Sequence, residues 1–220
     1  MPKYPSVLFC FIYSYAFGIG TVLFALTGAA AFVKIYHFDI AQVGMAIGLS
    51  TTIGSVIGEL AAGPVSDRIL YLSMKRNNGR ISSKARLTAT WPGAFLLPVG
   101  VIIEGVCLNY KTHWMGPVIG IDIAAFGLQI VSTNIYVYLA DCDKPQSAEV
   151  STLLNFGRLS CFSFRLEFYM NPFAKGTSYA IAWSLMGLIG VVWYGGIVLL
   201  MWKGQLWREK LGVPNIHRDL

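Results

Sequence analysis

The sequence predicts an all-α membrane protein with six transmembrane helices. Of its 220 residues, 55% are hydrophobic and only 13% are charged, whereas a typical soluble domain has about 25% charged residues. Apolar stretches of twenty or more residues follow one another with short polar breaks, and this length crosses a hydrocarbon core of about 30 Å. Helices are favoured over strands, because a β-barrel would show alternating segments of about ten residues separated by turns.

Six spans are expected, and each is long enough to cross a bilayer at about 1.5 Å per residue. They are residues 6–33, 40–63, 87–108, 114–140, 148–170 and 177–202. The first is too long for the apolar region of a cleaved signal peptide, so it is interpreted as a retained span. We expect residues 1–203 to form the membrane domain and residues 204–220 a cytoplasmic amphipathic tail, because basic residues alternate there with Leu206, Trp207 and Leu211.

The distribution of basic residues predicts the orientation. With both termini in the cytoplasm, 12 of the 17 Lys and Arg residues lie on the inner side, three on the outer side and two within the fifth span, as the positive-inside rule requires. The net charge of +6 would suggest nucleic acid for a soluble protein. Here the basic residues lie between apolar stretches, so we expect anionic lipid as the partner and no nucleic acid. The plasma membrane and the vacuolar membrane are not distinguished.

A motif lies where the second span ends. The residues are Gly58-Glu59-Leu60-Ala61-Ala62-Gly63-Pro64-Val65-Ser66-Asp67-Arg68, and a basic stretch at 75–80 follows. This resembles the G-x-x-x-D-R signature and basic loop of the major facilitator superfamily, found on the cytoplasmic side between the second and third helices of a six-helix half. The wider sequence looks like the second half of fungal members, in the stretches 36–48, 54–67, 86–87, 136–141 and 147–158.

The resemblance implies that the chain is a half-bundle equivalent to helices seven to twelve of a twelve-helix transporter. Such a protein moves a small solute by alternating access, here coupled to protons, along a path between two halves. The chain would then be a half or a fragment that pairs with a missing N-terminal six-helix half or with another copy. Its basic cluster lies further from Asp67 than in the tight family pattern, so the match is to the degenerate second copy of the motif.

The motif residues Gly63, Asp67 and Arg68 are the candidate gate. Gly63 permits close approach of a neighbouring helix. Asp67 can accept hydrogen bonds from helix N-terminal amides or pair with an arginine in one transport state. The alternative is an ordinary loop, from Pro64 to Arg86, whose arginines only fix topology. Tight helix packing is also expected at three G-x-x-x-G pairs: Gly44 with Gly48, Gly54 with Gly58, and Gly116 with Gly120.

Charged residues within spans mark candidate functional positions, because charge in hydrocarbon costs about 2.5–3.5 kcal/mol on insertion scales. Glu59 and Glu104 lie near span ends, where they can reach water, whereas Asp122 and Arg158 lie deeper, at similar depths. The resemblance implies that the first, second, fourth and fifth spans line the path and that the third and sixth are peripheral. The path candidates are then Asp122, Arg158, Asn134, Asn155, Tyr13, Tyr15 and Glu59.

Asp122 or Glu59 could carry the proton of a coupled cycle, while a structural Asp122–Arg158 pair is the alternative. An enzyme is not expected, because the three histidines lie in loops or the tail and the four cysteines are scattered. No cofactor or metal site is predicted. The competing function is a non-transporting membrane interaction protein, a truncated remnant that binds lipid or a full-length relative.

Overall fold

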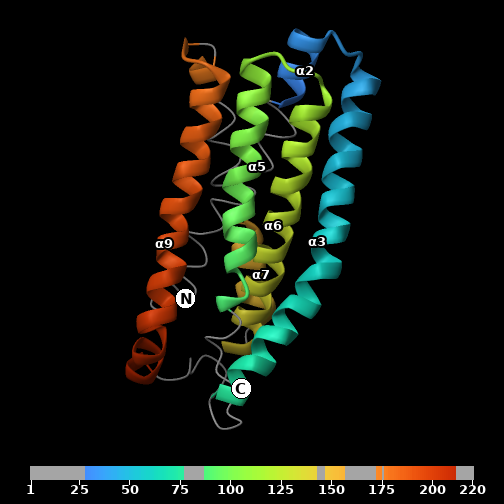
Figure 1. Cartoon of the computed structure of the whole chain (residues 1–220). Helices are drawn as coiled ribbons and strands as arrows, with labels where there is room; N and C mark the ends of the chain where they lie inside the picture. Colours follow the sequence, from blue (N-terminus) through green and yellow to red (C-terminus); the bar gives the residue numbers. More distant parts are fainter. Residues whose placement is uncertain (1–27, 77–86, 143–146, 157–171, 175, 212–220) are drawn as a thin grey trace.

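The computed structural model describes residues 28–76, 87–142, 147–156, 172–174 and 176–211, and this part of the chain is helical without any strand (Figure 1). Its main helices are α2 (Ala29–Tyr36), α3 (Ile40–Arg76), α5 (Trp91–Asn109), α6 (Met115–Cys142), α7 (Ser147–Phe156) and α9 (Tyr179–Leu211). The predicted all-α class is therefore confirmed for the described residues.

Four helical segments are long and apolar enough to cross a membrane: Ile40–Lys75, Trp91–Asn109, Met115–Ala140 and Tyr179–Leu199. They match the second, third, fourth and sixth predicted spans. Most of the predicted spans 6–33 and 148–170 lies outside the described residues, so the total of six stays a prediction.

Helix α3 is longer than the sequence suggested. We expected it to end at Gly63 and a loop to begin at Pro64, but the helix continues through Pro64 to Arg76. A proline removes one backbone hydrogen bond and clashes with the preceding turn, which bends a helix without necessarily ending it. Figure 1 shows the lower, teal part of α3 leaning away from the direction of its upper part. The break between the second and third spans therefore starts after residue 76.

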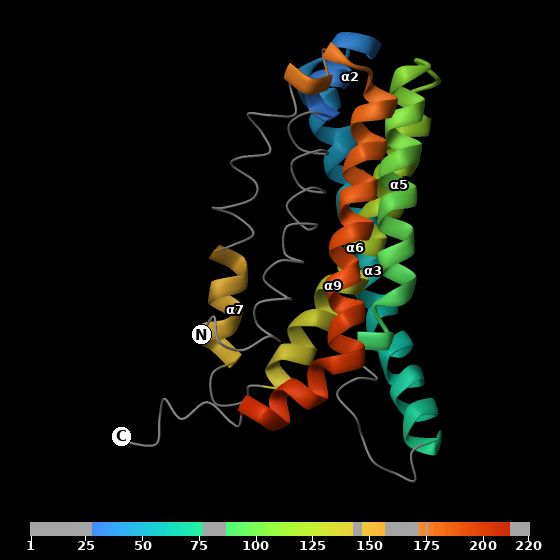
Figure 2. The ribbon, with the colours of Figure 1, turned by 90° about the vertical axis from the view of Figure 1, so that its left-hand side faces the viewer.

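The long helices stand in one layer in the order α9, α5, α6, α3 (Figure 1), and α7 lies to one side of this layer (Figure 2). The most extensive packing joins α5 to α6, α3 to α6 and α5 to α9, and α6 also contacts α7. The short connection at 110–114 makes α5 and α6 antiparallel neighbours. Helix α9 continues past Trp202 to Leu211, and its last part turns aside (Figure 2).

Glycines bring α3 and α5 close to α6. A Cβ atom built on Gly54 would lie 2.6 Å from the Asp122 carbonyl oxygen, and one on Gly58 would lie 2.8 Å from the Phe126 carbonyl oxygen. On the α5 side, a Cβ on Gly120 would lie 2.7 Å from the Glu104 amide nitrogen. Two of the predicted glycine pairs thus contain close helix contacts. The third pair, Gly44 and Gly48, has no described atom within 4 Å of either built Cβ.

Candidate functional site

Helix α6 carries a stripe of polar side chains through much of the layer. Asp122, Gln129, Thr133 and Tyr136 are spaced by seven, four and three residues, so at 3.6 residues per turn they fall within about 60° of one another around the helix. Tyr136 lies fourteen residues beyond Asp122, a distance of about 21 Å along the helix axis, which is about two thirds of a hydrocarbon core. We call these four residues the α6 polar stripe.

Glu59 of α3 is hydrogen-bonded to the middle of this stripe. Its Oε2 atom accepts one hydrogen bond from Gln129 Nε2 and another from Thr133 Oγ1, each 2.7 Å long. The glycine contacts at Gly54 and Gly58 hold the two backbones close enough for these short bonds. No ion pair connects Glu59 to another described residue, and its side chain is exposed. The carboxylate is thus held by two neutral donors and remains open on one side.

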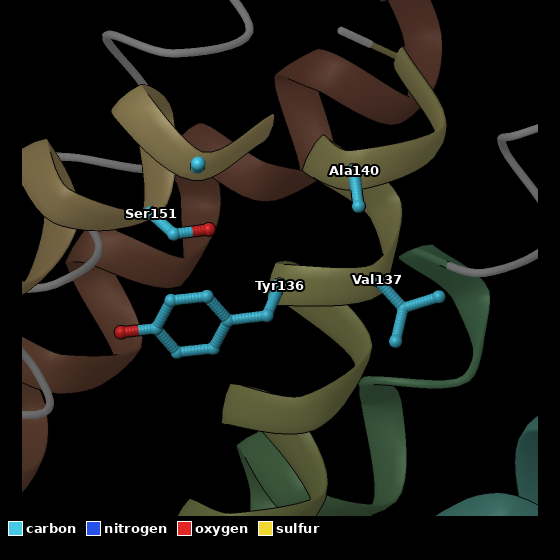
Figure 3. Close-up of a pocket in the computed structure, with 5 residues that line it drawn as sticks. Tyr136, Val137, Ala140 and Ser151 are labelled. Atoms are coloured by element: carbon cyan, nitrogen blue, oxygen red, sulfur yellow. The ribbon is translucent and has the colours of Figure 1, made fainter. Parts of the chain in front are cut away.

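The lower end of the stripe contacts α7. Tyr136 Oη donates a 2.8 Å hydrogen bond to Asn155 Oδ1, and Figure 3 shows the Tyr136 ring extending from α6 towards α7. A shallow, open pocket of about 350 Å³ lies beside this contact and is lined by Tyr136, Val137, Ala140, Ala148 and Ser151. Two hydroxyl groups and several methyl groups therefore face one space, a combination suited to an amphiphilic small molecule.

The other path candidates differ in their surroundings. Asp122 is partly buried, and its Oδ1 atom has no hydrogen-bond partner among the described residues. Asn134 is buried and donates from Nδ2 to the Ile130 carbonyl oxygen at 2.8 Å, so this bond stays within α6. Tyr13, Tyr15 and Arg158 lie outside the described residues. The predicted Asp122–Arg158 pair therefore stays a prediction.

The motif residues lie on α3 and not in a loop. Gly63, Asp67 and Arg68 are all exposed. Among the described residues, no ion pair or hydrogen bond involves the side chain of Asp67 or Arg68, and no atom lies within 4 Å of a Cβ built on Gly63. Their role as a gate stays a prediction.

The expectation for Glu104 was wrong. We placed it near the outer end of its span, within reach of water, but its exposed fraction is 0%. Distance along a helix sets the depth of a residue in the membrane, whereas its direction around the helix decides whether it meets lipid, water or a neighbouring helix. Glu104 lies on the side of α5 that packs against other helices.

Sequence reasoning missed Gln129, Thr133 and Tyr136, because polar residues of the fourth span were not compared for a shared helical face. The signal was present, since these residues share a helical face with Asp122. In the described part of the chain, no group of three or more His, Cys, Asp or Glu residues could hold a metal ion.

The chain is similar to fungal MFS-type transporters. It is 32% identical over 140 residues, 63% of its length, to the MFS-type transporter penM of Penicillium rubens. It is 27% identical over 202 residues, 87% of its length, to an uncharacterized transporter of Schizosaccharomyces pombe. It is also 25% identical over 167 residues, 73% of its length, to the probable drug/proton antiporter YHK8 of Saccharomyces cerevisiae.

These matches cover 26%, 40% and 32% of the respective relatives, so the chain spans well under half of their length. No protein-family model and no solved structure matches the chain. The resemblance found in the sequence is therefore supported by fungal transporters. Together with the four apolar helices, it identifies an integral, multi-pass membrane protein.

Proposed function

We propose that this chain, given its similarity to fungal MFS-type transporters, is part of a transporter that moves a small solute by alternating access coupled to protons. It would supply six helices equivalent to helices seven to twelve, with both termini in the cytoplasm. The α6 polar stripe carries the proposal beyond the similarity, because polar side chains at this depth are costly unless they face a polar path or a partner.

The packing suggests which side of the layer faces the path. The stripe faces α3 through Glu59 and α7 through Asn155, whereas α5 and α9 pack on each other. We therefore assign one wall of the path to α3, α6 and α7. The predicted residues Asp122, Asn134, Arg158, Tyr13 and Tyr15 remain candidates for the same path.

Glu59 is the proposed proton carrier. As a carboxylate it accepts two charge-assisted hydrogen bonds from α6, which are roughly twice as strong as neutral ones. Protonation weakens both bonds at once and so loosens the contact between α3 and α6. Proton binding is thereby linked to a change in helix packing, as a coupled transport cycle requires.

The solute is proposed to contact the pocket between α6 and α7. Tyr136 and Ser151 offer hydroxyl groups, while Val137 and the two alanines offer apolar surface. Gly63, Asp67 and Arg68 would form the cytoplasmic gate, at the end of α3 towards which the pocket lies.

The test measures proton flux in lipid vesicles that contain a pH-sensitive dye. The chain is reconstituted alone and together with the N-terminal six-helix half of the Penicillium rubens transporter, and a panel of amphiphilic organic compounds is added. We expect substrate-dependent proton flux from the pair, which Glu59→Gln abolishes. The matched control is Asp39→Asn, which changes an exposed carboxylate at the outer start of α3 and should leave the flux unchanged.

The competing function is a non-transporting membrane interaction protein. On α3, no described atom lies within 4 Å of a Cβ built on Gly44 or Gly48, and Met45 and Leu49 beside them are exposed. This small, apolar surface favours the packing of a helix from another protein against α3. Co-purification with a full-length relative, without proton flux in any combination, would support this alternative. Equal proton flux from the Glu59→Gln variant and the unaltered chain would refute the role of Glu59 as the proton carrier.

A further inference from the structure

Glu104 of α5 is a buried acid without a charged partner. Its exposed fraction is 0%, and neither carboxyl oxygen has a hydrogen-bond partner in the described part of the chain. No ion pair with a described residue neutralises it. Glu104 lies where α5 meets α6 and α9, and none of the hydrogen bonds of the α6 polar stripe to α3 or α7 involves it.

Two helices enclose the acid. On α6, Gly120 brings the backbone so close that a Cβ there would lie 2.7 Å from the Glu104 amide nitrogen. On α9, the large ring of Trp183 is also 0% exposed, and Gly105 leaves the space in which this ring packs. Tyr179 lies edge-on to Trp183, with ring centroids 5.5 Å apart.

The indole nitrogen of Trp183 is the partner that fits. Trp183 Nε1 is buried and, like the acid, has no hydrogen-bond partner among the described residues, and Trp183 packs against Gly105, the residue that follows the acid. An indole N–H only donates, whereas a carboxyl group can accept. A small rotation of either side chain would therefore satisfy two buried polar groups at once.

Among the described residues of α5, α6 and α9 near this place, no titratable group offers a positive charge. Cys107 follows on α5, and Tyr179 lies on α9. On α6, Asp122 lies two residues beyond Gly120, with its carbonyl oxygen against Gly54 of α3. An ionised carboxylate buried without a cation is far more costly than a neutral acid that is hydrogen-bonded.

We propose that Glu104 is a proton-binding site separate from the transport path, and that the bound proton lets α9 pack on α5 through a hydrogen bond from Trp183. The indole N–H donates to the carbonyl oxygen of the neutral acid, which keeps its own proton. The site lies five residues from the end of α5 at Asn109, about 7–8 Å along the helix axis, and α6 and α9 close it off.

The test is infrared spectroscopy of the purified chain in lipid bilayers at about pH 7, where a water-exposed glutamate is almost fully ionised. We expect a band from the C=O stretch of a protonated carboxyl group, and we expect Glu104→Gln to remove it. The matched control is Glu59→Gln, which removes an exposed carboxylate and should leave the band in place. Absence of the band from the unaltered chain, or its persistence in Glu104→Gln, would overturn the proposal.

A second variant tests the hydrogen bond itself. Trp183→Phe keeps an aromatic ring in the packed position but removes the donor, so the band should move to higher frequency. An unchanged frequency would refute the pairing with Trp183. If Glu104→Gln does not fold, Glu104→Asp with ¹³C-labelled aspartate gives the assignment instead, because the label should shift the band in this variant but not in the unaltered chain, where the acid is a glutamate. A band whose frequency stays the same with the label would refute the assignment to Glu104.

Discussion

The contact between α3 and α6 can be tested by adding a single methyl group. In Gly54→Ala the new Cβ would lie 2.6 Å from the Asp122 carbonyl oxygen and 3.1 Å from Ala125 Cβ. Ordinary van der Waals contact begins near 3.4 Å, so the helices must separate locally by about 0.8 Å, the difference between those two distances. The obstructing atom belongs to the α6 backbone and cannot rotate away.

The same separation stretches the hydrogen bonds of Glu59. Adding about 0.8 Å to the 2.7 Å bonds from Gln129 and Thr133 gives about 3.5 Å, where a hydrogen bond is nearly lost. Overpacking of this kind costs about 1–3 kcal/mol, and the better helix propensity of alanine offsets at most about 1 kcal/mol. We expect a net loss of about 1–2 kcal/mol, a 5- to 30-fold change in the unfolding equilibrium.

The assay is reversible unfolding of the chain in mixed micelles of lipid detergent and sodium dodecyl sulfate, followed by circular dichroism. Gly48→Ala is the matched control, because it lies on the same helix and no described atom is within 4 Å of its built Cβ. It should be neutral or slightly stabilising. Equal stability of Gly54→Ala and Gly48→Ala would refute the close contact.

Three further predictions concern other parts of the molecule. Tyr136→Phe removes the hydrogen bond from α6 to α7 and should lower solute flux severalfold while the unfolding midpoint changes little; a normal flux would remove this residue from the path. Thr90→Val removes the buried 2.6 Å contact with Tyr194 Oη and should cost about 1 kcal/mol in the same unfolding assay, whereas Thr90→Ser should retain most of it. In a cysteine-free background, Lys75→Cys should react with an impermeant maleimide only from the cytosolic side and Lys111→Cys only from outside; the reverse pattern would invert the orientation.

Much of the architecture could be predicted from hydropathy, because apolar length alone identifies helices that cross a membrane. The G-x-x-x-G pair at Gly54 and Gly58 also marked a real helix contact. The partner of that contact could not be predicted, since α3 packs on α6 and not mainly on its successor α5.

The site was predicted less well, for a physical reason. Sequence position gives the depth of a residue in the membrane but not the neighbour it faces. Glu104 was therefore misplaced, and Gln129 was overlooked although Glu59 was singled out. Pro64 misled the prediction of a helix end, because a proline weakens a helix at one turn while the following residues can still continue it.

The proline within α3 divides that helix into an upper segment, residues 40–63, and a lower segment, residues 65–76. Pro64 has no N–H to donate to the carbonyl oxygen of Leu60, so the backbone is easier to bend at this turn than elsewhere in the helix. The upper segment packs closely on α6 at Gly54 and Gly58 and is hydrogen-bonded to it through Glu59. A change of bend at Pro64 would therefore move the exposed residues Asp67 and Arg68 relative to α6, while the contacts at Gly54, Gly58 and Glu59 stay in place.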